Sequence, residues 1–211
     1  MRRFAALLLA AALCLTVSAC GGAGGDAPEP APAPAAPDAP VPVAPPEPLR
    51  LASLNVEFAV GGRDPAVLLA LRDTFPPLLI DALSEQNVTL DSAAVTFGTS
   101  GEATQLAMRS GAVQLAFLPA EDYFPYRGGL IVAAEAGGAP DLSLGLIVAA
   151  ASDDAAADER LADALRAALP ALRSALASYT GEAAAGAYGY DAAVLEQLGA
   201  LYEAQSAQDV H

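Results

Sequence analysis

Lysine and tryptophan are absent from the 211-residue sequence, and histidine occurs once, as His211. The strongly basic side chains are therefore ten arginines. The sequence also has 25 acidic residues, which gives a net charge of −15. A chain this acidic repels the phosphate backbone of nucleic acids and the head groups of anionic lipids. We therefore expect no nucleic-acid partner.

Histidine and cysteine are too scarce to support most catalytic chemistry. His211 alone gives neither the base of a Ser–His–Asp or Cys–His nucleophile nor a zinc-ligand set. The two cysteines, Cys14 and Cys20, lie within the first twenty residues, so the remainder has no disulfide or thiol to offer. The acidic residues form no D-x-D-x-D-G loop for a hard metal ion. We predict a protein that is not an enzyme and has no metal site or cofactor.

Residues 1–19 have the pattern of a secretion signal, with Arg2 and Arg3 before the apolar run Phe4–Leu15. The run is shorter than the ~20 residues that span a bilayer. Cleavage after Ala19 as in an ordinary signal peptide is one interpretation. The sequence V-S-A-C ending at Cys20 favours a second, a lipobox. We expect Cys20 to be acylated and to anchor the protein extracytoplasmically to the cell membrane.

Residues 20–48 are expected to be an extended tether, because beyond Cys20 they are almost entirely glycine, alanine, proline, valine and acidic residues. A proline-rich interaction ligand is an alternative, but the flanking arginine typical of such ligands is missing. The folded domain is then predicted over residues 49–205, followed by a tail at 206–211. About 155 residues are enough for one domain with a sizeable core.

The stretch Ser92–Phe124 predicts a strand–helix–strand unit. Ala93–Phe97 and Val113–Leu118 are short apolar runs typical of buried strands. Between them, Thr99 and Glu102 have capping-box spacing, and Gly111 marks the end of the helix. Such a βαβ unit has parallel strands and binds ligands beyond their carboxyl ends.

The rest of the folded part alternates strands and helices, which predicts an α/β domain with a mostly parallel sheet flanked by helices. A first strand is expected at Arg50–Val56, followed by two helices separated by Pro76 and Pro77. The remaining expected elements are strands at 129–136 and 142–150, a helix at 154–168 that restarts after Pro170 and runs to Ser178, and a last helix at 191–204.

The sequence M-R-S-G, followed by V-Q-L-A-F-L-P and Tyr123, resembles the first lobe of the phosphate/phosphite/phosphonate ABC-transporter substrate-binding proteins (PhnD-type). The resemblance runs from Leu49 to Ala139 and, more weakly, from Leu161 to Tyr202. It implies one lobe of a type II periplasmic-binding-protein-like fold. It also implies a membrane-anchored solute-binding component of an ABC-type uptake system. No stretch corresponds to the family's second lobe.

Two loops are candidate anion sites. At Thr99, Ser100 and Gly101 a helix start offers free amides and the positive end of its dipole. The alternative is a plain capping box that uses those donors. Pro119 and Ala120 align with the family's second pocket loop and offer backbone amides.

Three further residues border the expected crevice. Tyr123 is a candidate ligand contact, with packing at the sheet edge as the more common role for such a residue. Asn55 and Glu57 are placed at the carboxyl end of the first strand. The Glu57 carboxylate could hold an amine or cation on a ligand, and the alternative is a solvated loop charge.

Two functions follow from these expectations. The first is uptake of a small anionic solute, phosphonate- or phosphate-like, with an ABC permease as partner. The second is an interaction protein that has lost its solute and docks on a permease, a partner lipoprotein or a second copy of itself. A single lobe leaves its ligand half in water, so we expect weak solute binding.

Overall fold

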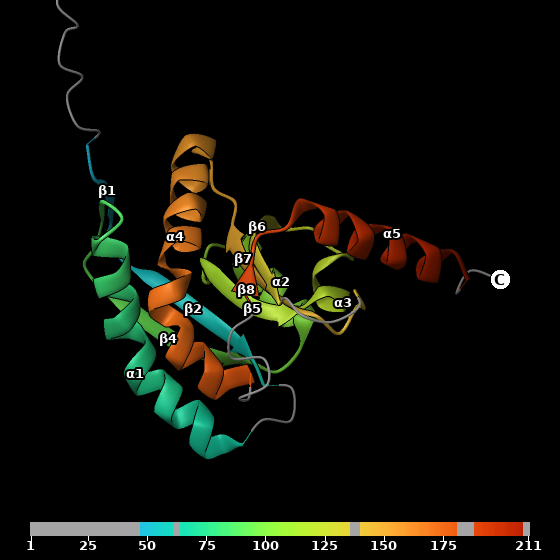
Figure 1. Ribbon diagram of the computed structural model, residues 1–211, viewed down its shortest axis with the longest axis horizontal. Coiled ribbons are helices and arrows are strands. Elements are labelled where there is room, and N and C mark those ends of the chain that lie inside the picture. Colours follow the sequence, from blue (N-terminus) through green and yellow to red (C-terminus); the bar gives the residue numbers. More distant parts are fainter. Residues whose placement is uncertain (1–46, 61–63, 136–139, 181–187, 209–211) are drawn as a thin grey trace, which may run out of the picture. The chain divides into compact units, whose positions relative to one another are not determined.

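The structure is organised around a sheet of six strands within the described residues, in the order β4-β2-β5-β7-β6-β8 (Figure 1). This computed structural model describes residues 47–60, 64–135, 140–180 and 188–208. The predicted leader, most of the tether and His211 lie outside these ranges. The strands are β2 (Leu54–Ala59), β4 (Ala93–Gly98), β5 (Leu115–Pro119), β6 (Gly129–Glu135), β7 (Gly145–Ala150) and β8 (Tyr188–Gly189).

The sheet is mixed. Strands β4, β2 and β5 are parallel, whereas β7, β6 and β8 are joined by antiparallel pairings. The predicted α/β fold and the three parallel strands of the first half are confirmed. A mostly parallel sheet is a correct description of that half only, because β7 returns along β5 in the opposite direction. Strand β2 lies between β4 and β5, so the strand–helix–strand unit crosses over one strand.

Helices cover both faces of the sheet. On one face lie α1 (Pro65–Ser84) and α4 (Ala155–Thr180), and on the other lie α2 (Gly101–Arg109), α3 (Ala120–Tyr123) and α5 (Ala192–Gln208) (Figure 1). Each face has its own apolar core. Alternation along β2 explains the first core, because Leu54, Val56 and Phe58 all point into it.

An aromatic cluster forms the centre of the core beneath α1 and α4. The rings of Phe58 and Phe117 stack with centroids 4.1 Å apart, and Phe75 meets Phe58 edge-on at 5.2 Å. Tyr179 also packs on Phe58, and its hydroxyl donates to the carbonyl oxygen of Ala59 at 2.7 Å. These contacts join α1 and α4 to the middle of the sheet.

Both proline-containing helices are continuous, contrary to the sequence-based expectation. Helix α1 begins as predicted, with the Asp64 carboxylate accepting a hydrogen bond from the Ala66 N–H, but it continues through Pro76 and Pro77. Helix α4 likewise continues through Pro170. A proline costs one helical hydrogen bond. The buried residues on either side of each proline keep the helix packed on the sheet and outweigh that loss.

The predicted first strand is divided in two. Strand β1 (Leu49–Leu51) pairs in parallel with β3 (Val88–Leu90) as a separate two-stranded sheet, and β2 begins only at Leu54. Strand β3 is three residues long and has no counterpart among the predicted elements. No second lobe is present among the described residues. None of the helices in the described ranges is long and apolar enough to cross a membrane.

Candidate functional site

The carboxyl ends of the three parallel strands meet at one edge of the sheet. Because β2 lies between β4 and β5, the loops after β4 and β5 lie on either side of the end of β2. Helix α2 follows β4 directly, and the short helix α3 follows β5. Ligands of open α/β sheets bind at this kind of edge.

Ser100, and not Thr99, caps helix α2. Its backbone is extended (φ −155°, ψ 151°) and its hydroxyl accepts a hydrogen bond from the Ala103 N–H at 3.2 Å. Thr99 is exposed. Within the described residues, the backbone N–H groups of Gly101 and Glu102 have no acceptor. The helix start predicted at Thr99–Gly101 is therefore present, one residue later than expected, and keeps unused donors.

Two carboxylates lie against the glycines at this helix start. A Cβ at Gly101 would overlap the Asp122 carboxyl group, and a Cβ at Gly98 would lie 2.7 Å from Glu57 Oε1. Thr96 donates from its hydroxyl to Glu57 Oε2 at 3.3 Å. The two glycines thus leave room for a carboxylate on each side. Glu57 was predicted as a ligand contact, whereas Asp122 was considered only as part of a weakly supported hard-metal site with Glu57 and Glu121.

The local electrostatics follow from these positions. Burial raises the pKa of Asp122, because the ionised carboxylate is partly removed from water. Burial also raises the pKa of Tyr123, an effect that the positive charge of Arg127 partly offsets. Arg109 lies at the far end of α2, where its guanidinium stacks on Tyr126 at 5.1 Å. The site combines free amides with carboxylates.

The second predicted loop is occupied by internal contacts. The Ala120 N–H donates to the carbonyl oxygen of Leu144 at 2.9 Å, so this amide is not available to a solute. Tyr123 is buried and its hydroxyl donates to the carbonyl oxygen of Gly129 at 3.0 Å. The packing role considered for Tyr123 agrees with these contacts. Pro119 is half-buried at the end of β5.

Asn55 lies away from the edge, which corrects its predicted place. Strand β2 continues to Ala59, so Asn55 is near its amino end. Its N–H donates to Gln114 Oε1 at 2.8 Å and its side-chain amide to the carbonyl oxygen of Ala112 at 3.0 Å. Asn55 therefore stabilises the turn between α2 and β5.

Gln105 was missed by the sequence analysis. It is fully buried, and its Nε2 lies 3.5 Å from the carbonyl oxygen of Asp122. Its Oε1 is the one buried side-chain oxygen or nitrogen of the described residues that has no hydrogen-bond partner. A polar residue in the second turn of an amphipathic helix gives no sequence signal for such a position.

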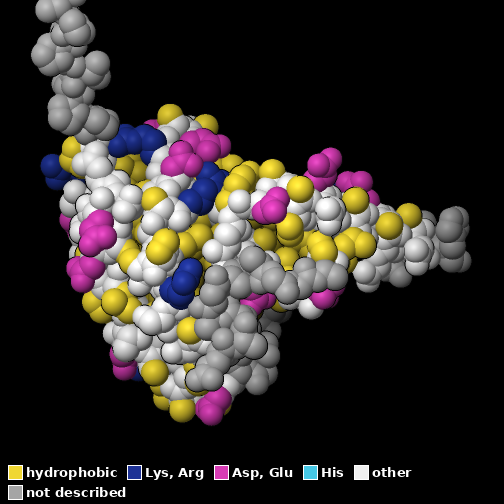
Figure 2. All heavy atoms as spheres, in the orientation of Figure 1, with side chains coloured by type: hydrophobic (Ala, Val, Ile, Leu, Met, Phe, Trp, Pro, Cys, Tyr) yellow, Lys and Arg dark blue, Asp and Glu magenta, His cyan; other side chains and the backbone are white. Residues whose placement is uncertain are grey.

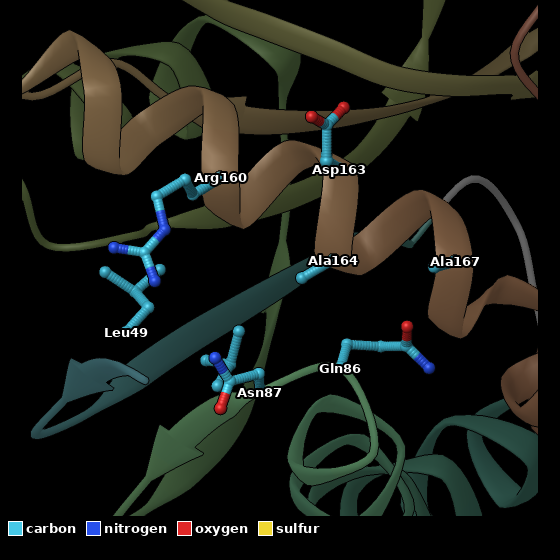
Figure 3. Close-up of a pocket in the computed structure, with 8 residues that line it drawn as sticks. Leu49, Gln86, Asn87, Arg160, Asp163, Ala164 and Ala167 are labelled. Carbon is cyan, nitrogen blue, oxygen red and sulfur yellow. The ribbon is translucent and has the colours of Figure 1, made fainter. Parts of the chain in front are cut away.

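A hollow of about 310 Å³ lies where β1 and β3 face α4 (Figure 3). Arg160 reaches toward Leu49, and the Asp163 carboxylate points away from it. Its two charged side chains are already engaged: Arg160 donates to the carbonyl oxygen of Glu47 at 2.6 Å, and Asp163 pairs with Arg166 at 2.7 Å. No group of three metal-ligating side chains occurs in the residues that the structure describes.

No protein-family model matches the sequence, and no curated protein is similar enough to count as a relative. Two solved structures of XAC2383 from Xanthomonas citri are similar in fold, each with a TM-score of 0.53. The structure bound to chloride ion is 10% identical to this chain and the structure bound to ATP is 7% identical. In both, 75% of this chain matches 99% of the neighbour. The neighbour is therefore also a unit of this size, and the likeness shows the fold alone.

Proposed function

We propose that this chain is the solute-binding lobe of a membrane-anchored extracytoplasmic receptor of the phosphonate/phosphate type. The observation that carries the proposal is the start of α2, where the N–H groups of Gly101 and Glu102 have no acceptor in the described part of the chain. Such a helix start attracts an anionic head group without needing a basic side chain. An ABC permease is the expected partner. The resemblance of Ser92–Phe124 to the receptor family supports the same function.

The ligands of the structures that are similar in fold bear only on the charge of the solute. XAC2383 was solved with chloride and with ATP, and both are anions. XAC2383 therefore has an anion bound in each of these two structures. We carry this across as support for an anionic solute and not for ATP itself.

The carboxylates beside the helix start indicate what else the solute contains. Glu57 and Asp122 would repel a plain phosphate ion, whereas an amine on the same solute would pair with them. The best match is a small zwitterion with a phosphonate or phosphate at the α2 amides and an ammonium group near Glu57. Because one lobe leaves it partly in water, we expect millimolar affinity.

Titration of matched solutes tests this function. 2-Aminoethylphosphonate should bind more tightly than ethylphosphonate, with backbone amide shifts largest at Gly98, Gly101 and Glu102. Glu57→Gln should remove the advantage of the amine, whereas Glu85→Gln, on the exposed end of α1, should not. Equal binding of both solutes would refute the zwitterion. No shift with either at tens of millimolar would refute solute binding.

A second function, protein docking without a solute, is favoured by the Ala120 contact. Its amide is bonded to Leu144, so the loop that should complete the pocket contributes no donor. A lobe in which one of the two expected loops offers no donor is suited to a role in which a partner protein covers this edge of the sheet. If a solute saturates the isolated protein in a titration without any partner protein, that result would count against this alternative.

A further inference from the structure

Helix α5 is only partly covered by the rest of the chain. Leu198 is fully buried, and Tyr202 stacks on Phe124 with ring centroids 5.7 Å apart. One turn further, contact with the described residues is slight, and the helix runs away from the sheet (Figure 1). Apolar side chains occur on all its sides, a pattern typical of a helix surrounded by other elements.

The uncovered flank of α5 forms a groove with the loop at residues 140–142. Two adjoining hollows, of about 410 and 570 Å³, share Pro140 and Leu201. Leu201 is 42% exposed although it lies one turn from the buried Leu198. Figure 2 shows hydrophobic side chains running along this helix. We call this surface the α5 groove; its apolar lining is Pro140, Leu142, Ala200, Leu201 and Ala204.

Most charges beside the α5 groove are acidic, and the exception, Arg127, is paired with Glu203 of α5 at 3.1 Å. Asp141 lies in the wall of the groove, and hydrogen bonds from Ser143 lower the pKa of that carboxyl, which keeps it ionised. Glu196 precedes Gln197, which lines the groove, and the backbone N–H of Glu121 donates to the carbonyl oxygen of Leu142. No arginine lines the groove in the part of the chain described here.

We propose that the α5 groove binds an amphipathic helix of a partner protein, with an apolar stripe flanked by lysine or arginine. The apolar lining accepts the stripe, as in other helix-in-groove complexes, and the surrounding carboxylates pair with the basic flanks. A second copy of this chain is a poorer occupant, because it would bring the same carboxylates to the interface. The partner site does not depend on the solute site at α2.

A synthetic peptide probes the groove directly. An amphipathic Leu/Lys helix of about four turns, titrated into the full-length chain, should shift the backbone amides of Leu142, Leu201 and Ala204. Leu201→Glu should weaken its binding at least tenfold. This variant separates docking from non-specific attraction, because it makes the protein more acidic and would otherwise strengthen binding of a basic peptide. Leu69→Glu, at a leucine that is 51% exposed on α1, is the matched control and should bind like wild type.

Several outcomes would overturn the proposal. They are unchanged or tighter peptide binding by Leu201→Glu, equal binding of a Leu/Glu peptide of the same pattern, or no binding at all. A dimeric mass in light scattering that Leu201→Glu converts to a monomer would assign the groove to a second copy instead. Unchanged solute titration in Leu201→Glu would show that the two sites are separate.

Discussion

At the scale of single residues, the start of α2 depends on two glycines that have no side chain. Gly98 and Gly101 have side-chain neighbours where a Cβ would be, and these neighbours are the polar groups of Glu57, Thr104 and Asp122. Neither glycine needs an unusual backbone conformation, since positive φ among the described glycines occurs only at Gly111. These two positions therefore need glycine because a larger side chain would not fit, and not because the backbone needs the conformational freedom of glycine.

Gly101→Ala should therefore destabilise the fold by about 1–3 kcal/mol, the usual cost of overpacking. Both Cβ and Cγ of Asp122 lie where the new methyl group would be, so a rotation of the carboxylate alone cannot relieve the overlap. Denaturant unfolding measures the loss. Gly189→Ala, with no atom within 4 Å of the added Cβ, is the control. Equal stability of the two variants would contradict the assigned contact.

Asp122→Asn should stabilise the protein at neutral pH. Burial raises the folded pKa of Asp122 above its unfolded value, so the ionised form is disfavoured in the fold. This penalty is absent below about pH 4, where the carboxyl is protonated in both states, and grows as pH rises through the folded pKa. The difference in unfolding free energy between variant and wild type should therefore be small at pH 3 and positive at pH 7. A pH-independent difference would assign the effect to something other than ionisation.

At the scale of secondary-structure elements, Arg166 stabilises an irregular part of strand β6. The register of β6 against β7 shifts between Ile131 and Ala133, which is a bulge or local irregularity. Arg166 of α4 donates to the carbonyl oxygens of Ile131 and Val132 at 3.1 and 3.2 Å. Its guanidinium also lies 4.3 Å from the ring centre of Tyr190. Helix α4 thus supplies donors that this part of the strand lacks.

Arg166→Ala should lower the free energy of unfolding by about 1.5–3 kcal/mol, the range for hydrogen bonds to a charged group. Arg166→Lys should recover little of it, because a single ammonium cannot make the forked contact to two carbonyl oxygens and stack on a ring. Arg173→Ala, at an exposed position of the same helix, should be nearly neutral in the same thermal or denaturant measurement. Full recovery by lysine would show that charge alone matters.

Sequence reasoning predicted most elements but failed where tertiary contacts decide. The helix start near Thr99 and the glycine stop at Gly111 are local signals, and both appear in the structure, the first displaced by one residue. The uninterrupted helices at Pro76 and Pro170, the short β3 and the antiparallel return of β7 depend on packing partners far along the chain. The contact between Asp122 and Gly101 joins α3 to α2, and no pattern of residue spacing in the sequence predicts it.

At the scale of the whole molecule, the described residues form a single lobe with a core on each face of its sheet. The solute edge at the start of α2 and the α5 groove lie on the same face of that sheet, with α3 packed near both. A partner helix at the groove would therefore contact the layer of helices to which α2 also belongs.

Membrane attachment is a prediction about the full chain. Cys20→Ser should release the protein from the membrane fraction of the producing cell, because the sequence V-S-A-C predicts Cys20 as the acylated residue. Cys14→Ser, inside the apolar run of the leader, should leave the protein membrane-bound. Fractionation followed by detection of the protein distinguishes the two variants. Retention of Cys20→Ser in the membrane would refute the lipid anchor.

Strand β4 ends the sheet, and its outer side pairs with no strand in the described ranges. Its sequence A-A-V-T-F-G has no charge and no proline, and its pairing with β2 has no break in register. Natural sheets usually protect such a border, because it can accept a strand from another molecule. Long storage of concentrated samples should therefore produce ordered aggregates that grow from this border. Ala94→Lys, at an exposed position, should delay them in a light-scattering time course, whereas Ala70→Lys, at an exposed position of α1, should not.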